Sequence, residues 1–345
     1  MPVMTVNGLI EKSALGIVMP HEHIFLDLSV FYTEPKNIGD KNIARGPVTM
    51  DKLGLLKRNP FAVLDNLQMT DETTQVEELF FLKSAGCNTV VDATCIGMGR
   101  DPRLLAMASA KTGLNIVVGS GFYVEGALDA ETLDLSEKSI EDLIVKEIES
   151  GIGHSGIRAG IIGEIGVSHL MYPFEEKSLR AACRAQTRTG APLLIHINPW
   201  STQGLNVIEI VNEYKIPVEK VTICHVDVEN NEDYIFKLLG AGVFIEFDNF
   251  GKEMFMDIWD CKPGSGRFVT DWQRVLLIKK LIDHGFEKQL LFSCDVCLKS
   301  LLRAYGGWGY DHVLQHIIPM LEEVGIKPEK IQSILTENPA RWLDC

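Results

Sequence analysis

The stretch Ala191-Pro192-Leu193-Leu194-Ile195-His196 is short and apolar, and it ends on a histidine. It is one of eight similar runs separated by segments with helical spacing, and the other seven occupy residues 16–23, 88–92, 115–119, 159–164, 221–225, 243–247 and 290–295. Short β-branched runs that alternate with helices are typical of a parallel sheet covered on both faces. Eight such units predict an α/β fold, a closed (β/α)8 TIM barrel, with an open doubly wound sheet as the alternative.

One domain is predicted for the whole chain, residues 1–345, because α/β barrels reach this length as a single unit. The hydrophobic fraction of 46% is enough for one large core. A short N-terminal β-hairpin is expected between Thr5 and Gly16, with its turn at Asn7-Gly8. Two connections are long, 24–71 after the first strand and 248–270 after the seventh. In a barrel both would lie beside the C-terminal strand ends, where active sites are built.

The formal net charge is -14 at pH 7, and no cluster of Lys and Arg stands out. Binding to nucleic acid or to an anionic membrane surface is therefore disfavoured. The N-terminus has no basic region followed by an apolar core, so no secretory signal is expected, and no apolar run is long enough to span a bilayer. The eight cysteines are scattered through the chain, which favours buried thiols and a cytoplasmic location.

Polar residues stand where most of the predicted strands end: His21, His23, Glu164, His196, His225 and Asp295. A lone His-x-His is a weak signal, but in a barrel all of these ends open onto one mouth. Leaving such groups buried and without hydrogen-bond partners would cost roughly several kcal/mol in total. Hydrogen bonds among them without any metal are one solution. Imidazoles and carboxylates also suit divalent metals, and six ligands exceed what one tetrahedral zinc accepts, which favours two metal ions.

Several motifs together resemble the phosphotriesterase family of the amidohydrolase superfamily, and within it the phosphotriesterase-related proteins. They are His21-Glu22-His23, Gly163-Glu164-Ile165-Gly166, Ile195-His196, Cys224-His225-Val226-Asp227, Ser293-Cys294-Asp295 and 306–311. By this resemblance, His21, His23 and Asp295 would bind a buried metal, His196 and His225 a more exposed one, and Glu164 would bridge them. Many members carry a carboxylated lysine where this chain has Glu164. The resemblance also implies a homodimer.

The predicted ligands suggest a mechanism. Two cations that share a water lower its pKa and polarise the oxygen of the bond under attack. Asp295 is the predicted catalytic proton acceptor, although a role as ligand alone remains the alternative. Zinc is the expected metal, and Mn2+, Co2+, Ni2+ or Fe2+ suit the same ligands. Substrate contacts are predicted for Tyr123, Trp200 and Arg267, with Lys252 as a second cation for an anionic group.

Residues further from the predicted metals have simpler interpretations. Glu246 and Asp248 stand at the end of the seventh run and are expected to orient metal-bound histidines, with a loop cap as the alternative for Asp248. Five other histidines are expected to be ordinary surface or capping residues: His154, His169, His284, His312 and His316. Cys294 and Cys297 have CxxC spacing without a second pair, so buried thiols are favoured.

The leading hypothesis is a hydrolase with two metal ions, in which a bridging hydroxide attacks the carbonyl of a small molecule. The substrate would be an amide, of the N-acyl amino acid or N-acyl taurine type, or a lactone. Hydrolysis of phosphotriesters or aryl esters is the main alternative. A metal-binding protein without turnover and a redox protein that uses Cys294 and Cys297 are others. Specificity would depend on the loops 24–71 and 248–270, whose conformations the sequence does not predict.

Overall fold

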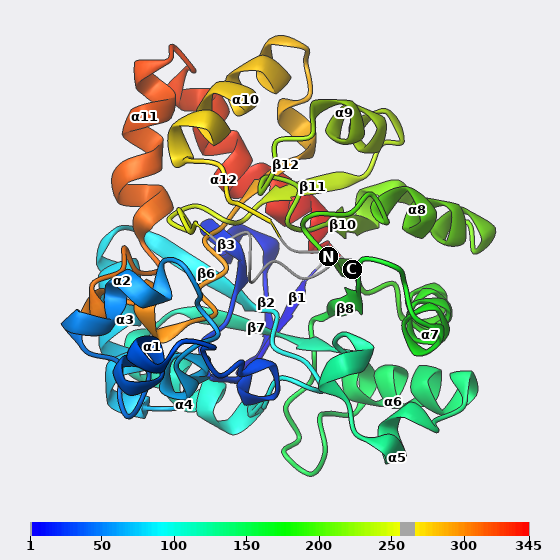
Figure 1. Ribbon diagram of the computed structural model, residues 1–345. Coiled ribbons are helices and arrows are strands. Elements are labelled where there is room, and N and C mark those ends of the chain that lie inside the picture. The colour runs from blue at the N-terminus through cyan, green and yellow to red at the C-terminus, as the bar shows by residue number, and fades with distance from the viewer. Residues whose placement is uncertain (1, 256–265, 345) are drawn as a thin grey trace.

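Figure 1 shows the computed structural model, which describes residues 2–255 and 266–344. Eight parallel strands form one sheet in the order β12-β11-β10-β9-β8-β7-β6-β3. Their bounds are β3 Ile17–Glu22, β6 Cys87–Asp92, β7 Asn115–Ser120, β8 Ile161–Val167, β9 Leu193–Ile197, β10 Val221–Ile223, β11 Phe244–Phe247 and β12 Leu290–Phe292.

The strand order distinguishes between the two predicted folds. Strands lie beside their sequence neighbours throughout, whereas a doubly wound sheet reverses its order. The two ends of the sheet also approach each other. The His21 amide donates to Ser293 Oγ at 3.1 Å, and the Asp295 amide donates to the His21 carbonyl at 3.2 Å. The prediction of a (β/α)8 barrel is therefore confirmed, with an irregular seam between β3 and β12.

Helices surround the strands in Figure 1. The longer ones are α3 Glu72–Ser84, α4 Pro102–Thr112, α6 Glu137–Glu149, α7 Pro173–Thr189, α8 Gly204–Glu213, α9 Glu232–Gly240, α10 Asp271–Asp283 and α12 Pro328–Trp342. Shorter helices are α1 Ile38–Ile43, α2 Leu53–Leu56, α5 Ala130–Leu133 and α11 Ile318–Glu323. Asp101 caps α4, its carboxylate accepting the amide of Arg103 at 2.8 Å. Within the described residues, no helix has the length and apolar character needed to cross a membrane.

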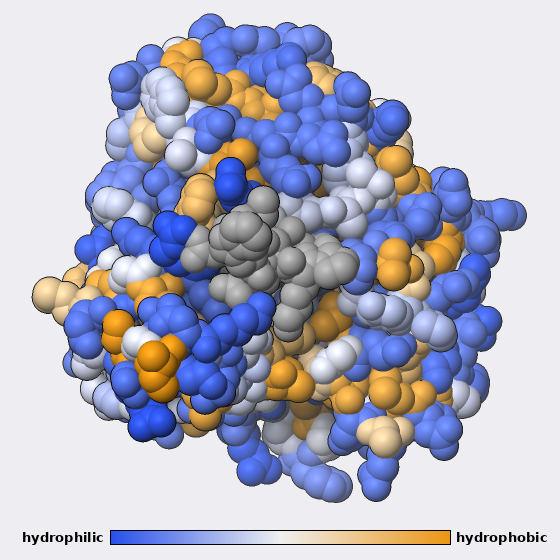
Figure 2. Space-filling view, in the orientation of Figure 1, coloured by the Kyte–Doolittle hydropathy of each residue, from blue (hydrophilic) through white to orange (hydrophobic). Residues whose placement is uncertain are grey.

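Side chains that point into the barrel form their own packed layer. All eight strands or their ends contribute to it, through Val18, Val91, Val117, Ile161, Leu194, Cys224, Phe244 and Leu291. Trp342 of α12 and Val3 join this layer. The larger cluster lies between the sheet and the helices. Figure 2 shows hydrophilic residues over much of the visible surface, with hydrophobic residues in separate groups. The barrel interior is thus filled with side chains below the strand ends that carry the site.

The N-terminal hairpin consists of β1 Val3–Thr5 and β2 Gly8–Ile10. Thr5 pairs with Gly8, so the two turn residues are Val6 and Asn7 rather than the predicted Asn7-Gly8. Gly8 has a φ of 107°, a conformation that glycine adopts readily. Because Gly8 supplies this conformation at the start of β2, the turn lies one residue earlier than predicted.

The long connection after β3 is folded. It contains a small antiparallel pair, β4 Leu26–Asp27 and β5 Gln68–Met69, and a hydrophobic cluster of Ala44, Val48, Leu56 and Val63. In the connection after β11, residues 256–265 lie outside the described chain, so only part of this connection is described. Both connections supply walls of one cavity, as Phe31, Phe61, Lys252 and Met254 show. They therefore lie on the same face of the barrel, as predicted.

Candidate metal centre

The six predicted ligand residues come together at one end of the barrel. His21 lies on β3, Glu164 on β8 and His196 on β9. His23 directly follows β3, whereas His225 and Asp295 lie in the segments after β10 and β12. All are buried except His196, whose side chain is 13% exposed. The backbone of His225 and of Asp295 has a positive φ, 58° and 45°. This conformation is unfavourable for residues with a Cβ, and such strain concentrates at functional sites.

Glu164 lies at the middle of the group. Its Oε1 is 3.4 Å from His23 Nε2, and its Oε2 is 3.1 Å from His196 Nδ1. The same Oε2 is 3.7 Å from the Nε2 of both His21 and His225. Asp295 completes the other side, with Oδ1 at 3.1 Å from His23 Nε2. Oε1 thus faces His23, while Oε2 lies between His21, His196 and His225, so this one carboxylate contacts both halves of the cluster.

His21 provides a test of whether the site suits a metal. Its Nε2 is fully buried and has no hydrogen-bond partner among the described residues, since the nearest carboxylate oxygens are 3.7 and 3.8 Å away. A buried polar atom without a partner is unfavourable and calls for an explanation. A divalent cation bound by this nitrogen together with His23 and Asp295 would satisfy it. The residues present therefore fit a metal ion.

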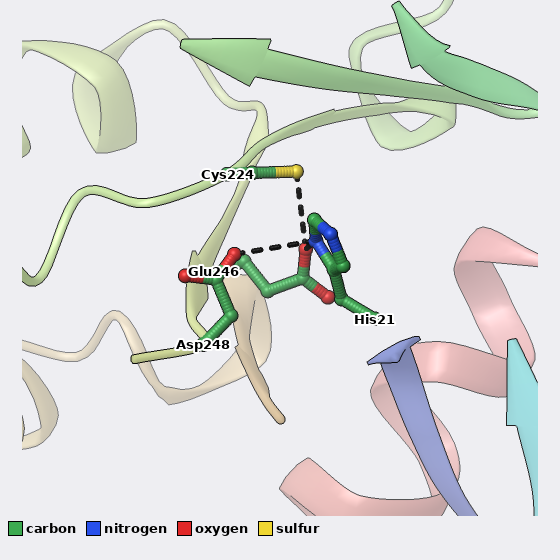
Figure 3. Close-up of side chains that lie close together, drawn as sticks. All are labelled: His21, Cys224, Glu246 and Asp248. Carbon is green, nitrogen blue, oxygen red and sulfur yellow. Dashed lines mark hydrogen bonds and ion pairs between the residues drawn. The ribbon is translucent and has the colours of Figure 1, made fainter. Parts of the chain in front are cut away.

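Glu246 and Asp248 contact histidine rings at Nδ1, on the side away from the Nε2 atoms that face Glu164. Figure 3 shows both carboxylates beside His21, whose Nδ1 lies 3.2 Å from Glu246 Oε2 and 3.3 Å from Asp248 Oδ2. The Nδ1 of His225 is 3.0 Å from Asp248 Oδ1. The Cys224 thiol donates to Glu246 at 3.2 Å. Carboxylates in this position orient an imidazole and leave its Nε2 for a metal, as the sequence suggested.

The charges in the cluster stabilise one another. Burial opposes the protonation of His23, but Asp295 and Glu164 outweigh it and raise its pKa to about 9. The same competition, with Asp248 as the main partner, raises the pKa of His225 to about 10. Burial alone would favour the neutral form of Glu164, yet the surrounding histidines hold its pKa well below the usual range. Glu164 is therefore ionised and able to bind a cation.

A model of the phosphotriesterase family matches residues 1–343, which span this whole arrangement. The chain belongs to the phosphotriesterase family. Two relatives are the N-acetyltaurine hydrolases of Danio rerio and Homo sapiens, 34% and 32% identical, each match covering 99% of this chain and 97% of the relative. Membership of this family and these relatives together identify the chain as a hydrolase.

Two solved structures are similar to this family member. A resiniferatoxin-binding protein from Rhodobacter sphaeroides has a TM-score of 0.95 and 34% identity, covering 99% of this chain and 94% of that one. The phosphotriesterase homology protein from Escherichia coli, solved with phosphate in its active site, has a TM-score of 0.79 and 27% identity. That match covers 96% of this chain and 99% of the other. The barrel of this phosphotriesterase-family chain is thus shared with solved proteins.

A cavity of about 320 Å³ opens beside the cluster of this phosphotriesterase-family hydrolase. Tyr123 and Trp200, two predicted substrate contacts, line it, and the Tyr123 ring packs edge-on against His196 with centroids 4.9 Å apart. Arg267, the third, is exposed, and its guanidinium lies 4.5 Å from the centre of the Phe255 ring. It is not among the described lining residues. Lys252 is, and its ammonium contacts Asp295 Oδ2.

Two features of this phosphotriesterase-family site were not predicted from the sequence. Glu22, between the two histidines, accepts hydrogen bonds from Ser293 Oγ at 2.8 Å and from the amides of Cys294 at 2.7 Å and Val296 at 2.9 Å. It therefore holds the segment that carries Asp295. Asp92 accepts the amide of Ile24 at 2.8 Å in the same manner. Carboxylates that bind backbone amides have no spacing pattern that would identify them.

Two predictions about other residues can also be compared with the structure. Cys294 is buried and Cys297 half-buried, and both are free thiols. His312 was expected at the surface, and this was wrong. It is buried, its Nε2 lies 2.7 Å from Asp271 Oδ2, and its ring stacks on Trp308 with centroids 5.0 Å apart. The hydrogen bond with Asp271 compensates for its burial.

Proposed function

We propose that this chain uses two metal ions to hydrolyse the amide bond of N-acyl amino acids or N-acyl taurines. The single observation that carries the proposal is the placement of Glu164 between two groups of histidines. The names of the relatives in Danio rerio and Homo sapiens support an amide substrate. Lactones remain within the proposal, because their carbonyl carbon is attacked in the same way.

The residues divide between the two ions. His21, His23 and Asp295 would hold one ion, His196 and His225 the other, and Glu164 both. A metal pair supplies an acidified water and polarises the carbonyl oxygen. The exact metal is not specified by this ligand set, since zinc and other divalent transition ions accept imidazole and carboxylate.

We propose that Asp295 transfers the proton. Its Oδ1 faces His23, at 3.1 Å from Nε2, while Oδ2 lies on the side of Lys252 and the cavity. Buried neighbours of opposite charge, Lys252 first, outweigh the effect of burial and hold the pKa of Asp295 well below its usual range. An ionised carboxylate here can accept a proton from the attacking water and deliver it to the departing amine nitrogen. An amine leaving group requires this delivery.

Phosphotriester hydrolysis is the second candidate. The Escherichia coli structure with phosphate in its active site is the observation that favours testing it. A third candidate is ligand binding without turnover, suggested by the similar resiniferatoxin-binding protein of Rhodobacter sphaeroides. The presence of Asp295 beside the cavity favours turnover, because binding alone needs no proton acceptor.

The test is a hydrolysis screen of zinc- and manganese-reconstituted protein over N-acyl taurines, N-acyl amino acids, lactones, aryl esters and a phosphotriester. We expect amide turnover, two metal ions per chain by elemental analysis, and loss of both in Glu164→Gln. Asp295→Asn should lower kcat by more than about 100-fold. Asp283→Asn changes an exposed aspartate on α10 and is the control. Turnover of the phosphotriester alone, or one ion per chain, would contradict the proposal.

A further inference from the structure

Lys252 follows β11 and is 4% exposed. Its amide donates to the Asn249 carbonyl at 3.0 Å, and its carbonyl accepts Arg274 Nη2 at 3.5 Å, so the backbone is held on both sides. Its ammonium contacts Asp295 Oδ2. Among the described residues that line the catalytic cavity, Lys252 is the only lysine or arginine.

The ammonium has more donors than its described partners use. It carries three N–H groups, and the one carboxylate oxygen that it contacts accepts one of them. The Cys297 thiol next to it is a weak acceptor. Much of the remaining cavity wall is apolar, including Met254, Phe268 and Leu298. A buried cation with spare donors is costly unless an anion completes its surroundings.

Other cations near the cavity are already engaged. Arg267 is exposed and lies over the Phe255 ring. Lys299 pairs with Asp65 at 2.6 Å. Lys252 is therefore the described cation best placed to meet an acidic group inside the cavity, in surroundings where a charge-assisted hydrogen bond is strong.

We propose that Lys252 binds the acidic group of the substrate and so selects N-acyl amides whose amine part carries a sulfonate or a carboxylate. This inference rests on the proposed function and deepens it. Because Lys252 contacts Asp295, the acid would lie on the side of the departing amine. The apolar walls contributed by Phe31 and Phe61 of the 24–71 connection would then receive the acyl chain.

The test compares N-acetyltaurine with its uncharged primary sulfonamide, a substrate of nearly the same size. The readout is the ratio of the two kcat/KM values, measured in wild type and in Lys252→Met with zinc bound. We expect the ratio to fall about 10- to 100-fold in Lys252→Met, the loss of one or two charge-assisted hydrogen bonds. The change should appear mainly in KM for the sulfonate. Lys252→Arg keeps the charge and should recover part of the ratio.

Arg267→Gln is the matched control, since it removes the same charge from an exposed position. A fall in the ratio for Arg267→Gln, with none for Lys252→Met, would overturn the proposal. Binding of propane-1-sulfonate, measured by calorimetry, separates the two proposals. If the wild type hydrolyses neither amide, the proposed function fails, while weaker sulfonate binding by Lys252→Met still supports the anion site. Equal sulfonate binding by both proteins would refute it.

Discussion

Glu22 is the residue whose replacement tests most directly how the barrel holds its metal ligands. It lies on β3, and its carboxylate accepts three hydrogen bonds from the segment after β12. Asp295 lies within that segment, between the two residues whose amides Glu22 accepts. The strands β3 and β12 form the irregular seam of the barrel, so Glu22 replaces part of a missing strand ladder.

The structure gives a magnitude for Glu22→Gln. Burial raises the pKa of Glu22 to about 7, so above that pH the substitution removes a charge from a group of nearly the same shape. The new NH2 group would also face a donor from Ser293, Cys294 or Val296. Hydrogen bonds to a charged group contribute about 1.5–3 kcal/mol each, and an unpaired buried donor costs about 1–3 kcal/mol. Losing one bond and leaving one donor unpaired gives a total of about 2.5–6 kcal/mol in the free energy of unfolding. Displacement of Asp295 by about 1 Å would lower kcat roughly 100-fold.

Urea unfolding followed by circular dichroism, together with zinc affinity, measures both effects. The control is Glu78→Gln on α3, because Glu78 is also buried and accepts two amides, from Arg303 at 3.1 Å and Ala304 at 2.8 Å. This control should lower stability without weakening zinc binding. If Glu22→Gln unfolds within about 1 kcal/mol of wild type, or if its zinc affinity is unchanged, the assigned role of Glu22 is wrong.

Three further outcomes are expected. Chelation should abolish hydrolysis and added zinc should restore it, measured by the same turnover assay; activity that survives complete metal removal would contradict the metal centre. Asp271→Asn should lower the free energy of unfolding at pH 7 by about 2–4 kcal/mol, because Asp271 pairs with His312 and buried Arg274. Burial raises the pKa of Asp271, but the hydrogen bond from His312 and the charge of Arg274 outweigh burial and hold this pKa below its usual range. The difference in free energy of unfolding between Asp271→Asn and wild type should therefore be complete above the pKa of about 4 that Asp271 has in the unfolded chain. It should vanish as the pH falls through the pKa of Asp271 in the folded protein, and urea titrations at several pH values measure it. Gly166→Ala should destabilise the fold by about 2–3 kcal/mol in the same titration, because the added Cβ would lie 2.2 Å from the Val124 amide nitrogen. An unchanged free energy of unfolding would mean that the backbone at Val124 moves away at no cost.

The strands and the meeting of the six polar side chains could be predicted because both depend on local pattern and on one rule of topology. Short apolar runs such as 191–196 mark buried parallel strands, and in a barrel their C-terminal ends meet. Residues as far apart as His21 and Asp295 are thereby brought together without knowledge of any contact. Glu246 and Asp248 were predictable for the same reason, since Glu246 lies near the end of β11 and Asp248 follows it directly.

What could not be predicted depends on contacts that leave no local trace. Glu22 and Val296 are distant in sequence, and their bond uses a backbone amide that every residue except proline possesses. The burial of His312 depends on α10, which supplies Asp271 as its partner. Arg267 and Lys252 look equivalent in sequence, yet one is exposed and the other buried. Only the three-dimensional path of the 248–270 connection distinguishes them.

Carboxylates next to the metal ligands share one structural task. Strand ladders end where the ligands begin, so the backbone amides there need other acceptors. Beside His23, the amide of Ile24 donates to Asp92, and on either side of Asp295 the amides of Cys294 and Val296 donate to Glu22. The amide of His225 itself donates to Asp248. Asp248 also contacts the His225 ring, so one group holds both the backbone and the side chain of a ligand. The acids that close the top of the barrel are therefore also those that orient the proposed metal ligands, and changes in them should alter stability and activity together.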